Sequence, residues 1–274
     1  MHLGAYFERI GFGGHAGPTL ETLCDLQRRH TLAVPFENLD VQLGRTLSTD
    51  IREAYTKIVD RGRGGWCYEQ NGLFGWALEE LGFEVTRVAA AVMHEQRGDI
   101  ATANHLALLV RTPDDRETVY LADVGFGGSL LEPIELAEAD CEQAPFRLGL
   151  RRRDEGRWQY YEDGGDGEFT FDFAPVAGDE AALSHRCRFL QTSPESSFVL
   201  NLVAQLRDED THRTLRGRVL TLLSPNGSDT RLLDSADELV ETLEQLFGLE
   251  VPEVADLWPQ IVARHAEVFG EDSD

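Results

Sequence analysis

Apolar residues recur at helical spacing along the first third of the chain. Thr19 precedes one run in which every third or fourth residue is apolar, which predicts a helix. A second run follows Asp50, which together with Glu53 can cap a helix N-terminus. A third run, CYEQNGLFGWALEELGF, begins at Cys67 and is ended by Gly82. The three apolar faces consist of Leu20, Leu23, Cys24 and Leu26; of Ile51, Ala54, Tyr55, Ile58 and Val59; and of Leu73, Trp76, Ala77 and Leu81.

The periodicity changes in the middle of the chain. Short segments rich in β-branched and aromatic residues alternate there with turn-forming clusters such as TPDD and DGGDG, a pattern typical of strands. The predicted strands cover residues 85–93, 105–111, 117–124, 157–163 and 168–173. We therefore expect a β-rich middle that folds as a barrel or as a strongly curved sheet.

The last third combines both patterns. Segments 197–206 and 217–224 are predicted strands, and SPNGSD forms a turn. A capping box opens a predicted helix over Ser235–Phe247, and another helix is predicted over 253–269. The order of these elements, with no repeat and no low-complexity linker, predicts an α+β fold of three compact parts that share one site.

The charge of the chain narrows the partners that it can bind. The formal net charge is -24, spread along the sequence, and Lys57 is the single lysine among 25 basic residues. Such a surface repels phosphate groups, which argues against nucleic-acid binding. Its self-repulsion is relieved at about 1 M salt, where the Debye length falls to roughly 3 Å. We therefore hypothesise an adaptation to high salt; the alternative is an ordinary acidic protein from a genome that favours arginine.

The sequence shows no signal for a membrane or a metal. Apolar runs are short compared with the ~20 residues of a membrane span, and the first residues lack the basic and apolar regions of a signal peptide. The cysteines form no C-x-x-C pair, and the histidines lack metal-ligand spacing. These features predict a cytoplasmic protein, a monomer or weak oligomer, with no metal and with free thiols at Cys24, Cys67, Cys141 and Cys187.

Cys67 has the surroundings of a reactive cysteine. It follows Gly64 and Gly65 in the segment RGRGGWCYEQNG and begins a predicted helix. A thiol at a helix N-terminus meets the positive end of the helix dipole and free backbone N–H groups, and both favour the reactive thiolate. The two glycines let the backbone turn tightly and leave room for an acyl group. On this local pattern alone, a buried structural cysteine is an equally good interpretation.

A thiol nucleophile needs a base, and the base needs a residue that orients it. His105 begins the predicted strand 105–111, and Asp123 ends the predicted strand 117–124. If the two strands are antiparallel neighbours, the start of the first lies beside the end of the second. His105 and Asp123 are then adjacent and flank the helix that carries Cys67. Taken singly, each residue has a simpler interpretation, as a surface histidine at a strand start and as a turn-forming aspartate.

Five segments resemble the arylamine N-acetyltransferase family. RGGWCYEQN matches the signature R-G-G-x-C-x-E-x-N at each fixed position, and HTLAVPFENLDV resembles the segment that ends in P-F-E-N-L-D. NHLALLV and YLADVGFGG follow in the order and spacing of the family's histidine and aspartate segments, and FLQTSPESSFVLNLVAQ resembles a stretch of its third domain. The resemblance implies an α+β fold of three domains with a papain-like Cys-His-Asp core. The implied domains are a helical bundle at 1–84, a β-barrel at 85–190 and an α/β lid at 191–274.

The resemblance also implies an activity. The acyl donor is acetyl-CoA, and the catalytic triad is Cys67, His105 and Asp123. In this ping-pong mechanism the acetyl group passes to Cys67 as a thioester, CoA leaves, and an arylamine, arylhydrazine or arylhydroxylamine attacks the thioester. His105 takes the thiol proton and later serves the acceptor amine, while Asp123 fixes the tautomer of His105.

Residues that bind the two substrates follow from the same resemblance. An aromatic acceptor pocket is implied at Phe36, Phe126 and Phe198, for which plain core packing is the alternative. The loop before His105 lacks the glycine often found there, and an acidic residue is implied close to an anionic cofactor. Contacts with acetyl-CoA are implied at Thr102, Asn104, Phe189 and Glu195.

The competing class of enzyme is a papain- or transglutaminase-like thiol hydrolase or amidase. That class uses the same order of cysteine, histidine and aspartate and the same cysteine at a helix start. The P-F-E-N and DVGFGG segments favour the transferase. A binding protein with a relic site is disfavoured because the full triad is present.

Overall fold

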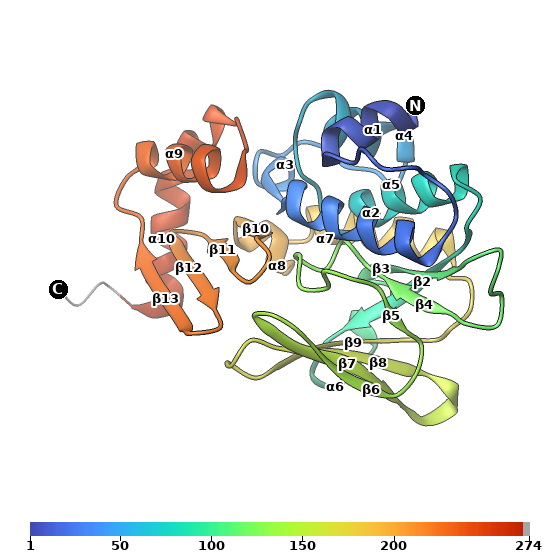
Figure 1. Cartoon of the computed structure of the whole chain (residues 1–274). Helices are drawn as coiled ribbons and strands as arrows, with labels where there is room; N and C mark the ends of the chain where they lie inside the picture. Colours follow the sequence, from blue (N-terminus) through green and yellow to red (C-terminus); the bar gives the residue numbers. More distant parts are fainter. Residues whose placement is uncertain (271–274) are drawn as a thin grey trace.

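Helices form the first third of the protein, as the periodicity predicts (Figure 1). The computed structural model describes residues 1–270. The helix α5 lies at the centre of this part, where α1, α2 and α4 surround it with apolar side chains. The bounds of the helices are Leu3–Ile10 for α1, Leu20–Ala33 for α2, Leu39–Gln42 for α3, Ile51–Tyr55 for α4 and Cys67–Glu80 for α5.

The second predicted helix differs from its prediction in two details. Asp50 caps α4, since its carboxylate accepts a hydrogen bond from the Arg52 N–H at 2.7 Å. Glu53 takes no part in this cap, because its carboxylate accepts a hydrogen bond from the Ser48 hydroxyl instead. After α4 the backbone widens into a π-helical turn over Thr56–Asp60, where the apolar spacing predicts a continuous α-helix.

The middle of the chain folds into one antiparallel sheet with the strand order β5-β4-β3-β2-β9-β8-β7-β6. The sheet curls into an open half-barrel with β5 and β6 at its two ends, which confirms the predicted strongly curved sheet (Figure 1). A short helix α6 (His94–Arg97) and a 3-10 turn (Gly98–Ala101) connect β2 to β3. The strands are β2 Glu84–Val92, β3 His105–Arg111, β4 Tyr120–Ala122, β5 Ile134–Glu135, β6 Ala139–Gln143, β7 Phe146–Arg152, β8 Trp158–Asp163 and β9 Glu168–Phe173.

Most of the strands predicted for this region are present. Four of them agree with β2, β3, β8 and β9 to within one residue. The segment 117–124 is shortened to β4, because the Asp115 carboxylate binds the N–H groups of Glu117 and Thr118 in a turn. The prediction omits β5, β6 and β7. Of these, β5 and β6 are short, whereas β7 alternates apolar and polar residues in the pattern of a strand.

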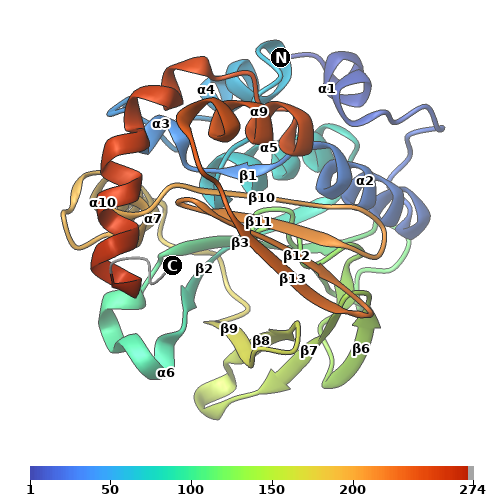
Figure 2. The same ribbon diagram turned by 90° about the vertical axis from the view of Figure 1, so that its left-hand side faces the viewer.

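The last third adds a second antiparallel sheet with the order β1-β10-β11-β12-β13. Its edge strand β1 comes from the first third of the chain, and α9 and α10 share an apolar core with the sheet. Figure 2 views the molecule from this end. The strands are β1 Phe36–Glu37, β10 Val203–Arg207, β11 His212–Arg216, β12 Val219–Ser224 and β13 Gly227–Leu232; the helices are α7 Glu180–Thr192, α8 Ser197–Leu200, α9 Ala236–Phe247 and α10 Trp258–Phe269.

Two predictions for this region are partly wrong. The predicted strand 197–206 begins as the helix α8, because the Ser196 hydroxyl caps it by accepting from the Phe198 N–H at 3.3 Å. The strand β10 starts only at Val203. The last helix starts as a 3-10 turn over Pro252–Leu257, and α10 follows it.

The three parts are joined by side-chain packing as well as by the chain. Phe36 of β1 lies opposite Gln205 of β10, and Cys187 of α7 belongs to the same apolar cluster as Cys67. The boundaries at residues 84 and 190 therefore stay a prediction. No helix within residues 1–270 is long and apolar enough to cross a membrane.

Candidate active site

The site is built around the first turn of α5. Cys67 is the first residue of this helix, and Trp66 before it has an extended backbone with φ −95° and ψ −177°. The Glu69 carboxylate accepts a hydrogen bond from the Trp66 N–H at 3.2 Å, which fixes the start of the helix. Cys67 is 5% exposed, and that small exposure faces a cavity. The thiol therefore lies at the positive end of the α5 dipole and is reached from one side.

The structure brings His105 and Asp123 together as the strand pattern predicts. β3 and β4 are antiparallel neighbours, with Leu108 opposite Ala122. This register places His105 Nε2 at 2.6 Å from Asp123 Oδ2. Cys67 and His105 line the same cavity. Because Nε2 binds Asp123, Nδ1 is the nitrogen that is left to face the sulfur.

The charge of Asp123 controls the protonation of His105. Burial alone lowers the pKa of the imidazole, but the charge and hydrogen bond of Asp123 outweigh burial, and the pKa of His105 rises to about 10. At neutral pH the imidazole therefore keeps its proton. A protonated imidazole beside Cys67 can act as a general acid toward a leaving group.

Asn71 holds Asp123 in place, and the sequence reasoning did not assign it to the site. Its side-chain N–H group donates to Asp123 Oδ1 at 2.7 Å and to the Leu106 carbonyl at 2.6 Å. Its carbonyl oxygen accepts from the Val124 N–H at 2.9 Å. Asn71 thus joins α5, β3 and the end of β4 through one buried amide. Its position one helical turn after Cys67, on the same face of the predicted helix, was the available signal.

Two glycines are required by close packing around the site. A Cβ atom added to Gly125 would lie 2.7 Å from the Cα of Cys67, so only glycine lets this loop approach Cys67 so closely. A Cβ atom added to Gly64 would lie 2.2 Å from the Pro35 carbonyl oxygen. The expectation that Gly64 and Gly65 leave room for an acyl group is therefore wrong, because protein atoms occupy that space and neither glycine lines the cavity.

A cavity of about 310 Å³ opens beside Cys67 and His105. The three predicted phenylalanines, Phe36, Phe126 and Phe198, all line it. The Phe36 and Phe198 ring centroids are 6.1 Å apart, and the Phe126 ring lies 5.0 Å from the His105 ring. The walls are therefore aromatic next to the thiol, which suits a flat, apolar molecule. Within residues 1–270, no group of three or more His, Cys, Asp or Glu side chains is arranged to hold a metal ion.

The residues implied to contact acetyl-CoA divide into two groups. Asn104 lines the cavity, and its side-chain oxygen accepts from the Val92 N–H at 2.7 Å. Thr102, Phe189 and Glu195 are not part of the cavity wall. Arg186 links two of them, because its Nε donates to the Thr102 carbonyl and its guanidinium lies 5.1 Å from the Phe189 ring centroid.

Three charged residues line the cavity without having been predicted. Arg97 extends from α6 and Arg216 from the end of β11, and neither has an ion-pair partner among residues 1–270. Glu162 on β8 is the third. Sequence patterns indicate none of them, because α6 and β11 are not predicted as elements and Glu162 stands near the polar end of the segment WQYYED.

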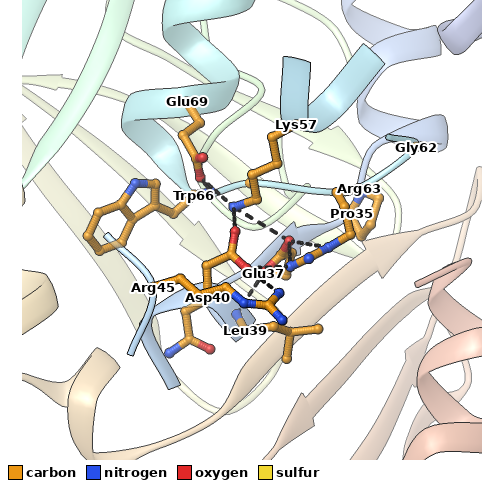
Figure 3. Close-up of polar contacts among 12 residues, drawn as sticks. Pro35, Glu37, Leu39, Asp40, Arg45, Lys57, Gly62, Arg63, Trp66 and Glu69 are labelled. Carbon is orange, nitrogen blue, oxygen red and sulfur yellow. Dashed lines mark hydrogen bonds and ion pairs between the residues drawn. The ribbon is translucent and has the colours of Figure 1, made fainter. Parts of the chain in front are cut away.

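A buried charge cluster lies beside the start of α5 (Figure 3). The Lys57 ammonium lies 2.9 Å from Glu69, 3.3 Å from Asp40 and 3.6 Å from Glu37. Arg63 binds Glu37 at 2.7 Å and Asp40 at 3.3 Å. The cluster therefore ties the segment before Cys67 to β1 and α3.

The pKa of each of three residues in this cluster depends on the neighbouring charges. Burial raises the pKa of Glu69, and the positive charge of Lys57 opposes this rise. Burial alone lowers the pKa of Lys57, but the three carboxylates outweigh it and raise the pKa above its usual range. The charges of Lys57 and Arg63 hold the pKa of Asp40 below its usual range although burial opposes them. Removal of one cation would leave like charges buried side by side.

The fold and this arrangement define a class of protein. A cysteine at a helix start that faces a histidine–carboxylate pair on adjacent strands is the arrangement of papain-like thiol enzymes. The family model described as N-acetyltransferase matches residues 19–256. This chain belongs to the arylamine N-acetyltransferase family.

Individual members of this family are similar to this protein over nearly the whole chain. The arylamine N-acetyltransferase of Mycolicibacterium smegmatis is 35% identical, with 98% of each chain covered. The solved structure of the Nocardia farcinica arylamine N-acetyltransferase is 37% identical, has a TM-score of 0.84 and covers 99% of this chain and 96% of its own. The Mycobacterium marinum arylamine N-acetyltransferase in complex with CoA has a TM-score of 0.86 at 32% identity, over 97% of this chain and 99% of its own.

Proposed function

We propose that this protein transfers an acetyl group from acetyl-CoA to arylamines and arylhydrazines through a thioester on Cys67. The observation that carries the proposal is the placement of Cys67 at the start of α5, against the His105–Asp123 pair and an aromatic cavity. The names of the relatives and the CoA bound in the Mycobacterium marinum structure support the same acceptor class and donor. Membership of this family favours the transferase over a thiol hydrolase.

In the first half-reaction the Cys67 thiolate attacks the carbonyl carbon of acetyl-CoA. The new C–S bond forms on Cys67 as the bond to the CoA sulfur breaks, and the protonated His105 gives its proton to the departing CoA thiolate. Asp123 stays ionised and holds the imidazole in the orientation that this transfer needs. Acetyl-Cys67 and free CoA are the products.

In the second half-reaction a neutral arylamine attacks acetyl-Cys67. The C–N bond forms, the C–S bond breaks, and His105 accepts the proton that the amine nitrogen loses. Cys67 returns as a thiolate beside a protonated His105. Aryl nitrogen is weakly basic, so the acceptor enters uncharged and its ring packs between Phe36, Phe126 and Phe198.

Arg97 and Arg216 give the cavity a positive rim in a strongly acidic protein. Neither side chain forms an ion pair within residues 1–270, so both guanidinium groups are available to an anion in the cavity. Guanidinium groups bind phosphates by charge-assisted hydrogen bonds. We assign them to the phosphates of CoA, beside Asn104, while contacts from Thr102, Phe189 and Glu195 stay predictions.

Intact mass spectrometry after mixing with acetyl-CoA tests the proposal. Wild type gains the mass of one acetyl group, and Cys67→Ala does not. The chain suits this assay because its single lysine, Lys57, is buried and cannot carry a stray acetyl group easily. Absence of the adduct from folded wild type, in low and in molar KCl, would refute the transferase mechanism.

We also propose that the enzyme acts in the cytoplasm, as a monomer or weak oligomer adapted to high salt. The four cysteines are free thiols, which fits a reducing compartment. The net charge of -24 fits a protein whose repulsion is screened by concentrated salt. Sedimentation in dilute and molar KCl measures the assembly state.

A further inference from the structure

Glu162 is a buried acid that the proposed mechanism does not use. It is the only acidic residue of the described chain that lines the cavity, and it is 8% exposed. Its Oε2 accepts a hydrogen bond from the Tyr160 hydroxyl at 3.0 Å. No arginine, lysine or histidine within residues 1–270 forms an ion pair with it at 4.0 Å or less. A buried carboxyl group without a basic partner is costly, so its place in the cavity wall calls for an explanation.

Aromatic contacts locate Glu162 relative to the nucleophile. The Phe126 ring lies 5.0 Å from the His105 ring, 5.7 Å from Tyr160 and 5.2 Å from Phe169, with which it is stacked. Glu162 bonds to Tyr160 and lies opposite Phe169 in the pairing of β8 with β9. Phe126 therefore lies next to His105 and also next to Tyr160 and Phe169. Glu162 lies beside these last two residues.

These contacts suggest an orientation for an acceptor whose ring packs on Phe126. Its amine must reach the thioester on Cys67 beside His105, and its ring packs on Phe126. The group at the opposite end of the ring then points toward Glu162. A carboxyl oxygen there accepts a hydrogen bond from an N–H or O–H group and repels a second carboxylate.

We propose that Glu162 selects acceptors by the group opposite the reacting amine. Acceptors that end in a hydrogen-bond donor are favoured, and acceptors that end in a carboxylate are rejected. This inference rests on the proposed function and narrows its acceptor class. A hydrogen-bonding site discriminates more sharply than a hydrophobic pocket, because a mismatched polar group stays unpaired.

Repulsion of an acceptor that ends in a carboxylate increases as Glu162 ionises. Burial raises its pKa to about 8, while hydrogen bonds from Ser129 and Tyr160 lower it in part. The charged groups that act on it from neighbouring elements are Asp123, which raises the pKa, and His105, which lowers it. Two further cations face the same region, Arg207 from β10 and Arg97 from α6. Above pH 8 the group is mainly a carboxylate.

Two matched acceptors test the proposal. 4-Aminobenzamide and 4-aminobenzoate have the same shape, and they differ in a neutral amide or a carboxylate opposite the amine. Their kcat/KM values are measured at about pH 6.5 and about pH 9 for wild type, Glu162→Gln and Glu168→Gln. Glu168 is the control, because it is an exposed acid on the adjacent strand β9 that pairs with Arg151 outside the cavity.

We expect wild type to prefer the amide more strongly at pH 9 than at pH 6.5. Glu162→Gln should reduce that preference at pH 9 by about tenfold and abolish its pH dependence, while Glu168→Gln behaves like wild type. Equal preference in wild type and Glu162→Gln overturns the proposal, as does transfer to neither acceptor. If Glu162→Gln does not fold, wild type alone decides the question. A preference of wild type for the amide that is the same at about pH 6.5 and about pH 9 then overturns the proposal. Formation of acetyl-Cys67, followed separately by mass, tests the proposed function itself.

Discussion

Replacement of Lys57 by methionine removes the central cation from the charge cluster below α5. Methionine fills a similar volume and adds no charge. Arg63 then still binds Glu37 and Asp40, and Arg45 lies 3.2 Å from Asp40 at the edge. Glu69 is left without an ion-pair partner within residues 1–270, because Lys57 is the cation that it binds. The Lys57 side chain is 8% exposed and that of Glu37 is fully buried, so water screens the remaining repulsion poorly.

The loss of stability should be large for one side chain. Breaking a buried ion pair by removing one partner costs about 3–5 kcal/mol of unfolding free energy. For a protein of this size, each kcal/mol corresponds to roughly 2–4 °C, so the melting temperature should fall by about 10 °C. The expected loss exceeds the roughly 0.5 kcal/mol of an ordinary surface substitution.

Acidic pH should restore part of this stability. Burial already raises the pKa of folded Glu69, and loss of Lys57 removes the main effect that lowers it. An acid with a raised folded pKa destabilises the fold when it is ionised, and the penalty disappears as pH falls below its unfolded pKa. The difference between wild type and Lys57→Met should therefore shrink from about pH 7 to about pH 5.

Thermal and urea unfolding, followed by circular dichroism at both pH values, measure this difference. Arg61→Met is the matched control, because it removes a cation from the same segment but from an exposed side chain. A shift for Lys57→Met no larger than that for Arg61→Met would refute the argument. So would a difference that grows as the pH is lowered.

Two further outcomes follow from the site and a third from the net charge. Asp123→Asn should slow acetylation of Cys67 by roughly 10²–10⁴, because His105 loses the charge that raises its pKa; rapid mixing with mass detection measures this rate, and a near-normal rate would contradict the assigned role. Arg216→Ala should raise KM for acetyl-CoA about tenfold and leave acceptor preference unchanged in steady-state assays; an unchanged KM would contradict a phosphate contact. The melting temperature should rise from dilute buffer to about 2 M KCl, and a flat or falling curve would contradict the high-salt hypothesis.

The arrangement of Cys67, His105 and Asp123 could be predicted from the sequence because short-range rules suffice for it. Cys67 follows glycines at a helix start, and His105 and Asp123 lie at facing ends of two consecutive strands. A short connection between alternating segments makes an antiparallel pair the natural arrangement. The family resemblance then located the phenylalanines, which come from distant parts of the chain and which no local pattern could bring together.

Other features could not be predicted because they depend on contacts that a local apolar pattern does not reveal. β1 is only two residues long and is a strand because β10, far along the chain, lies beside it. That Glu162 lines the cavity depends on Phe126, which comes from a distant segment and packs against Tyr160 and Phe169, and the sequence of β8 does not contain that information. The split of segment 197–206 into α8 and β10 depends on Ser196, since an apolar run alone favours a strand.

The single lysine illustrates how the acidic composition and the site are connected. Elsewhere the chain uses arginine for its positive charges, yet Lys57 lies where one cation meets three carboxylates at 2.9, 3.3 and 3.6 Å. An ammonium group has three donors arranged around a point charge, which suits partners on three sides. A guanidinium group is planar and matches carboxylates side by side, as Arg63 does with Glu37 and Asp40. The geometry of the cluster therefore accounts for a lysine at this position in a chain that otherwise uses arginine.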